Sequence, residues 1–207
     1  MEQAQPKHAR DAAVECAEAF LRLAEPVVIR IGNDVPESTQ SHPFLPSMGD
    51  VAAAATNLAF AIELYIKAIL IESKIDAPTG RDGHNLGKLH SAMPQHFKTV
   101  IERSYEETRK KHWNGKYPSI TLAMRPVPAN LPKWDDNRSE SLDLGALLDR
   151  SSDIFTAWRY IYEFKHPGEG GWQCHRFEYG LLLSACHAMR DTIKSLQNTQ
   201  NELTNAV

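Results

Sequence analysis

The chain has 207 residues, of which 42% are hydrophobic and 24% are charged, and its formal net charge is −3. This composition predicts a soluble globular protein of one domain over residues 1–207. The net charge excludes a strongly basic protein that binds nucleic acid through its whole surface. The three cysteines lie far apart without a CxxC pair, which indicates neither a disulfide framework nor a zinc site and favours the cytoplasm. The polar first ten residues do not resemble a signal peptide.

Helical periodicity dominates the first half of the chain. Apolar residues at three- and four-residue steps predict a first helix over residues 8–25. Pro26 then permits a kink or a stop, and residues 27–31 either continue the helix or extend. Residues 33–49 hold three prolines and read as a loop. A second helix is predicted from Asp50, as its cap, to Lys74, and its polar interruptions favour a buried helix over a membrane span.

The middle of the chain predicts two shorter helices and a long connection. Residues 80–83 are predicted to form a turn. A short helix is predicted to begin at residue 84 and to end near residue 93. A fourth helix over residues 94–113 begins with a proline at a permitted position. Residues 114–140 hold four prolines and form a long loop, with a short extended piece at residues 120–122.

The last third predicts two long helices, over residues 141–165 and 174–197, and Pro167 ends the first of them. We find no convincing sheet, so the predicted fold is all-α, an up-and-down helical bundle with a Pro-rich loop between its fourth and fifth helices. The second, fifth and sixth helices are expected at its centre. The core covers about residues 50–197, and residues 1–49 add a helix and a loop.

Two stretches carry a family resemblance. Ala61–Leu70 has the character of a Lys-Ala-Leu-Leu helix, and Gly83–Leu89 follows it with a His-Asn-Leu segment. Further on, six residues separate Arg159 from His166. Together these features resemble the HEPN domain family, the higher eukaryotes and prokaryotes nucleotide-binding helical bundle, whose motif is Arg-x(4–6)-His. The resemblance covers roughly residues 50–195.

The resemblance implies two alternative functions. Many HEPN domains are metal-independent endoribonucleases of toxin, abortive-infection or antiviral systems, in which a homodimer brings two Arg/His motifs together. Others are non-catalytic helical modules that bind a nucleotide, RNA or a protein partner. The resemblance therefore implies a homodimer through the helix that carries Arg159 and His166, and no cofactor. It also implies RNA or a nucleotide as ligand, and an antitoxin or a nucleotidyltransferase as partner.

Arg159 and His166 suit RNA cleavage chemically. In a helix they lie nearly two turns apart, about 10 Å along the axis, and Glu163 projects from the same side. A histidine transfers protons near neutral pH, an arginine holds two phosphate oxygens, and Glu163 could orient either one. Tyr160 follows Arg159 at the position of a supporting side chain. Alternatively, Arg159 and Glu163 form an ordinary ion pair, and His166 caps the helix.

Polar residues in and after the second helix have two interpretations each. Glu63 and Lys67 line the site beside Arg159, or they form an i,i+4 pair at the edge of the apolar stripe. His84 and His90 have no third ligand at suitable spacing, so no metal is predicted, and His84 is expected to be a cap or a core contact.

One basic cluster ends the fourth helix. Aromatic residues lie among its cations, which suits phosphate contacts and base stacking with single-stranded RNA. The alternative is a solvated helix end whose charge complements the helix dipole. The predicted RNA contacts are Arg109, Lys110, Lys111 and Lys116, with Trp113 and Tyr117 interleaved.

Overall fold

The protein is a bundle of helices with a small β-ribbon at one end. The structure, a computed structural model, describes residues 6–34, 47–113, 119–124, 141–152, 154 and 173–205. Its helices are α1 (Pro6–Asp34), α2 (Met48–Glu72), α3 (Leu86–Ala92), α4 (Gln95–Trp113), α5 (Leu144–Arg150) and α7 (Tyr179–Asn205), with a 3₁₀ turn, η1 (Gly80–His84). The ribbon pairs β1 (Ile120–Met124) with β2 (Gln173–Phe177). The predicted helical bundle is thus confirmed, with the ribbon added to it.

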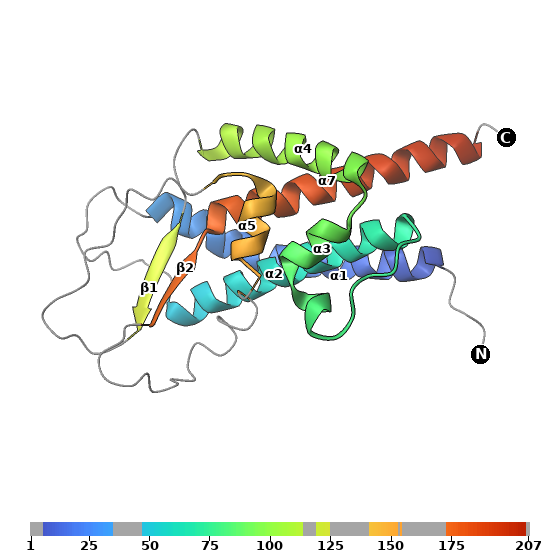
Figure 1. The fold of residues 1–207 in the computed structure, drawn as a ribbon. Coiled ribbons are helices and arrows are strands. Elements are labelled where there is room, and N and C mark those ends of the chain that lie inside the picture. Colours follow the sequence, from blue (N-terminus) through green and yellow to red (C-terminus); the bar gives the residue numbers. More distant parts are fainter. Residues whose placement is uncertain are drawn as a thin grey trace, which may run out of the picture.

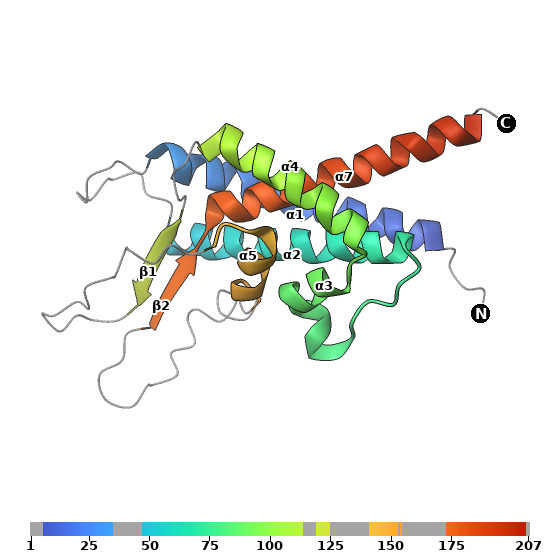
Figure 2. The same cartoon turned by 45° about the horizontal axis from the view of Figure 1, so that its top comes forward.

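The long helices lie side by side. α1 packs along α2, α2 packs against α7, and α7 packs against α4, while α3 contacts α2 and α5. The ribbon lies at one end of the bundle, and the first residues of α1 and the last of α7 lie at the opposite end (Figures 1 and 2). Of the three helices expected at the centre, α2 and α7 are there. The third was predicted over residues 141–165, of which residues 155–165 lie outside the described residues, and α1 packs along α2.

The first helix is longer than predicted, because α1 continues through Pro26 to Asp34. Proline removes one backbone donor and crowds the preceding turn, which costs about 3 kcal/mol in a helix interior. Pro26 is exposed, however, and Val28 and Ile31 beyond it are as fully buried as Leu21 before it. This apolar face against α2 keeps the helix continuous, so the stop that Pro26 permitted does not occur.

α2 begins with a capping box. The Ser47 hydroxyl accepts a hydrogen bond from the Asp50 N–H, and the Asp50 carboxylate accepts one from the Ser47 N–H, at 3.1 and 3.2 Å. This reciprocal arrangement satisfies two of the orphan donors of the first turn. The cap is therefore Ser47, and Asp50, predicted as the cap, is its partner three residues into the helix.

Replacing Ser47 by alanine is expected to destabilise the protein by about 1 kcal/mol, because the first turn of α2 loses its side-chain acceptor. Chemical denaturation of the purified variant measures this loss. Ser91→Ala, at an exposed serine near the end of α3, is the matched control, and it should leave the unfolding midpoint unchanged. Equal midpoints for the two variants would contradict the capping role.

The predicted fifth helix is interrupted early. α5 ends at Arg150, and the Ser151 N–H donates to the carbonyls of Leu147 and Asp149. The Ser152 hydroxyl donates to the Leu148 carbonyl at 3.0 Å, a local bond that competes with helix continuation. The continuous helix predicted over residues 141–165 is therefore wrong at residues 151–152, and residues 155–165 lie outside the described residues.

The last helix begins later than predicted, because residues 173–177 form β2. Its antiparallel register pairs Phe177 with Ile120 and Gln173 with Met124. The short extended piece predicted at residues 120–122 is confirmed as part of β1, whereas the expectation of no sheet was wrong. β2 could not be recognised locally, because its partner lies about 50 residues away and supplies the backbone hydrogen bonds.

A partly buried ion pair joins α5 to the junction of β2 and α7. Arg150 donates from Nε and Nη2 to the two carboxylate oxygens of Glu178, at 2.7 and 2.8 Å, and from Nη1 to the Ser141 carbonyl at 2.9 Å. The Glu178 side chain is only 6% exposed. Burial raises the pKa of Glu178 to about 7, and the Arg150 guanidinium opposes this effect because it favours the carboxylate.

α2 has the length and apolar composition of a membrane-spanning helix. Two thirds (67%) of its most apolar window is nevertheless buried within the bundle. Soluble core helices show the same combination, because a helix surrounded by protein is apolar on most sides.

Candidate functional site

The predicted catalytic residues lie outside the described part of the chain. Arg159, Tyr160, Glu163 and His166 fall within residues 155–172, and Lys116 falls within residues 114–118. Their predicted roles stay predictions. The described residues that sequence reasoning placed in a site are Glu63 and Lys67 on α2 and the cations at the end of α4.

At the end of α4, only part of the predicted basic cluster is accessible. The Arg109 side chain is 11% exposed and donates from Nη2 to both Glu106 oxygens, at 2.9 and 3.1 Å. Burial works against the Glu106 carboxylate, but hydrogen bonds from Arg109 and Lys110 outweigh it and lower the pKa of Glu106. The prediction of Arg109 as an RNA contact was wrong, because a phosphate contact needs an accessible guanidinium.

The other members of this cluster differ in exposure. Lys110 is 70% exposed, with Nζ 3.2 Å from Glu106, and Lys111 is also exposed. Trp113 is half-buried and packs edge-on against Tyr179, with ring centroids 5.7 Å apart. A Cβ at Gly32 would lie 3.1 Å from the Trp113 ring. Trp113 thus packs at the contact of α1, α4 and α7. Of the predicted RNA contacts that the structure describes, Lys110 and Lys111 are accessible.

A buried carboxylate on α2 contacts a lysine and a histidine. Glu63 is 6% exposed, and its Oε1 lies 2.7 Å from Lys67 Nζ. His84 Nδ1 lies 3.2 and 3.1 Å from the two Glu63 oxygens, across 21 residues of sequence. The i,i+4 pair predicted for Glu63 and Lys67 therefore exists, and a histidine joins it.

His84 differs from its predicted role. Its side chain is 54% exposed, so it is not a core contact, and it ends η1 rather than opening a helix. An ionised carboxylate only accepts hydrogen bonds, so Nδ1 carries the proton that faces Glu63. The indication in the sequence was Glu63 itself, because a carboxylate in an apolar helix needs partners.

The segment after His84 is fixed by side-chain hydrogen bonds. Asn85 caps α3 by accepting a hydrogen bond from the Lys88 N–H at 2.8 Å. The Ser152 hydroxyl lies 3.0 Å from Asn85 Oδ1, and it accepts a hydrogen bond from the Gly87 N–H at 3.1 Å. These bonds attach the start of α3, which follows His84 directly, to the residues after α5.

His90 is a core residue, unlike His84. It is buried, and its Nε2 has no hydrogen-bond partner within the described ranges. Burial lowers the pKa of His90, and the charge of Lys98 lowers it further, so the ring is neutral. Within the described ranges, no group of three metal-ligating side chains occurs.

Replacing Gly83 by alanine is expected to destabilise the protein by about 1–3 kcal/mol. The new Cβ would lie 2.7 Å from the Pro78 carbonyl oxygen, and a backbone atom cannot rotate away. Gly49→Ala is the control, because its Cβ would meet only the Ser47 hydroxyl at 3.6 Å. Urea unfolding compares the two; a Gly83→Ala variant as stable as Gly49→Ala would show that η1 shifts freely.

Comparisons with protein-family models, with curated proteins and with solved structures find no match for this chain.

Proposed function

We propose that the protein is a metal-independent endoribonuclease of the HEPN type, acting in the cytoplasm in a toxin or phage-defence setting. The single observation that carries the proposal is the spacing of Arg159 and His166 in the sequence. The helical architecture supports it, because the resemblance implies a helical bundle.

In the proposed reaction, His166 takes the proton of a ribose 2′-hydroxyl, and the 2′-oxygen attacks the adjacent phosphorus. Arg159 stabilises the charge that develops on the phosphoryl oxygens, and Glu163 orients one of the two. The bond from phosphorus to the 5′-oxygen breaks, and that oxygen takes a proton from the second histidine of a homodimer. The products are a 2′,3′-cyclic phosphate and a 5′-hydroxyl, so no water is consumed in this step.

One observation favours a second candidate, a non-catalytic helical module that binds a nucleotide, RNA or a protein partner. Tyr160 stands directly after Arg159, where the family often has Asn, Asp or His. A protein that binds RNA without cleaving it would fit this second candidate. An antitoxin or a nucleotidyltransferase is the partner proposed in either case.

The test is incubation of a labelled single-stranded RNA with the purified protein in the presence of a chelator. We expect fragments that end in a 2′,3′-cyclic phosphate, identified by mass spectrometry. The double variant Arg159→Ala/His166→Ala, purified in parallel, controls for contaminating nuclease. Equal cleavage by both preparations, or none by the wild type, would reject the proposal.

A further inference from the structure

The outer side of α1 carries an apolar stripe of its own. The buried residues of α1 lie in the core, where the helix contacts α2 and α7. On the opposite side, apolar residues recur at alternating steps of three and four, the spacing with which two helices pair along a common seam. The largest of them, Leu23, is 63% exposed. This outer stripe consists of Ala9, Ala12, Cys16, Ala19, Leu23 and Pro26, of which Ala19 is half-buried and the others are exposed.

Two charged residues, Glu15 and Arg22, flank the outer stripe along one edge. Both are exposed, and neither has an ion pair with another described residue. They lie seven residues, or about 10 Å, apart along the helix axis, so they do not contact each other within one chain. The charged side chains around them already contact partners within the chain, namely Arg10 with Asp11 and Glu72, Glu18 with Lys194, Glu25 with His187, Arg30 with Asp50 and Arg190 with Asp191. One acid and one base therefore remain at this edge for a contact outside the chain.

Two copies of this face are complementary when the helices run antiparallel. In one register Leu23 lies against the partner's Ala12, so that a large side chain meets a small one and the helices approach closely. The same two-fold axis places Glu15 beside the partner's Arg22, and this pair occurs twice. A shift by one heptad in either direction would instead place Arg22 against the partner's Arg22, or Glu15 against the partner's Glu15. The charges therefore select a single register.

We propose that α1 is a self-association surface, on which a second copy of this chain binds antiparallel through the outer stripe. A second copy fits because it brings the acid and the base that this edge lacks, at the same spacing. Two helices paired over about five turns bury less than the ~1,600 Å² of a standard stable interface, so we expect the dimer at micromolar protein concentrations. The inference goes beyond the proposed function, because it concerns α1 rather than the helix with Arg159 and His166, and it does not depend on RNA cleavage.

Replacing Leu23 by glutamine should raise the dissociation constant of this dimer about tenfold or more, because both copies lose an apolar contact. Sedimentation equilibrium of the full chain over a concentration series measures the constant. Val100→Gln, at an apolar residue of α4 that is 49% exposed, is the matched control and should leave the constant unchanged. A dimer formed elsewhere on the chain would respond to neither substitution.

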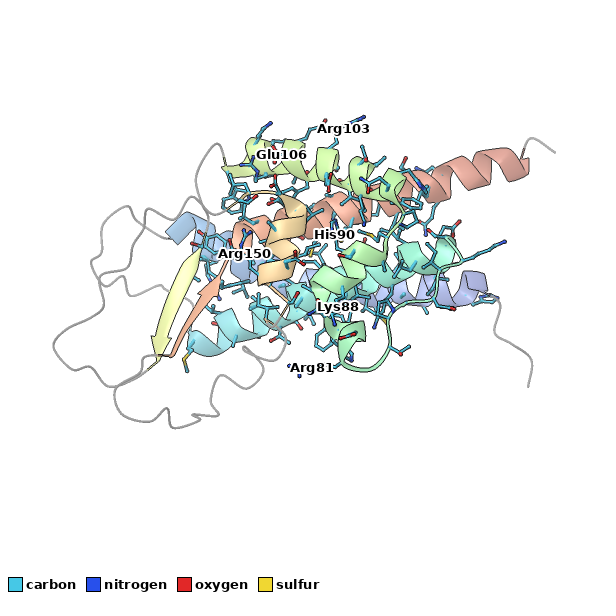
Figure 3. All side chains as sticks on the ribbon, viewed as in Figure 1. Arg81, Lys88, His90, Arg103, Glu106 and Arg150 are labelled. Atoms are coloured by element: carbon cyan, nitrogen blue, oxygen red, sulfur yellow. The ribbon has the colours of Figure 1, made fainter. Side chains whose placement is uncertain are left out.

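Charge reversal tests the register. Glu15→Arg or Arg22→Glu alone sets like charges against each other and should weaken the dimer about tenfold or more. An equimolar mixture of these two variants should dimerise like the wild type, because each copy then supplies the charge that the other needs. Arg103→Glu, at an exposed arginine on α4 (Figure 3), is the control and should leave the dissociation constant unchanged.

Three results would each overturn the proposal. They are a wild type that stays monomeric at about 100 µM, equal dissociation constants for Leu23→Gln and Val100→Gln, and a mixture of the charge variants that is no more dimeric than its components. A monomeric wild type that still cleaves RNA would reject the pairing of α1 and retain the nuclease.

Discussion

Replacing His166 by alanine is expected to slow RNA cleavage about 10²–10⁴-fold, because the reaction loses the group that moves the 2′-hydroxyl proton. Arg159→Lys is expected to slow it as well, since an ammonium lacks the planar fork that binds two phosphate oxygens. Single-turnover rates with a fluorescent RNA in chelator measure both effects. Lys165→Ala, at one of the six unspecified positions between Arg159 and His166, is the matched control and should retain the wild-type rate.

These variants separate catalysis from binding. Loss of His166 should lower the rate of the bound RNA and leave its affinity within a few-fold of the wild type. Arg159→Ala should change both, because the proposed contact is to the phosphate itself. If His166→Ala and Lys165→Ala cleave RNA at the same rate, His166 is not the proton-transfer group, and the non-catalytic module becomes the better description.

Replacing Arg150 by methionine is expected to destabilise the protein by about 3 kcal/mol at about pH 8. The variant removes the bidentate partner of a carboxylate that is 6% exposed, and methionine keeps most of the apolar stem. Arg30→Met is the matched control, because its pair with Asp50 spans 3.4 Å and both side chains are half-exposed. Exposed pairs of this kind contribute about 1 kcal/mol or less.

The effect of Arg150→Met should depend on pH in a direction set by Glu178. Burial raises the pKa of Glu178 to about 7 from an ordinary value of 4.5, so the folded protein binds this proton more tightly than the unfolded chain. Stability from this group is therefore present at low pH and is lost as the pH rises through 7. Protonated Glu178 needs no guanidinium, so the cost of the variant should shrink toward about pH 5.

Urea unfolding at several pH values measures this dependence. Arg150→Met in a Glu178→Gln background completes the double-mutant cycle, and there the cost should be small and independent of pH. A cost that is constant from about pH 5 to pH 8 in the wild-type background would show that Arg150 acts through packing rather than through the carboxylate.

Local patterns predicted the helices well where one face is apolar and the ends carry ordinary signals. α4 was placed within one residue of its observed start, and α2 within two residues of either end. Ser47 was missed as the cap of α2. Serine and aspartate both favour the position before a helix, and Asp50 lies only three residues after Ser47. α5 was overextended because its apolar pattern continues past Ser151 and Ser152, whose hydrogen bonds interrupt the helix.

The contacts of the candidate site could be predicted only in part, because some of them join residues that are far apart in the sequence. Glu63 and Lys67 are four residues apart, so their contact follows from helix geometry. His84 reaches Glu63 across 21 residues, and Arg150 reaches Glu178 across 28. No periodicity encodes such pairs; the sequence shows only that a charged residue in an apolar stretch requires a partner. Arg109 was misplaced because its cationic neighbours are accessible, whereas its own side chain faces inward.

The pairing of α1 with α2 bears on the order in which the protein folds. These helices are neighbours in the sequence, so their contact closes a short loop and costs little chain entropy. β1 and β2 meet only after about 50 intervening residues have been placed. A helical hairpin of α1 and α2 should therefore form the folding nucleus, and substitutions in β2 should speed unfolding more than they slow folding.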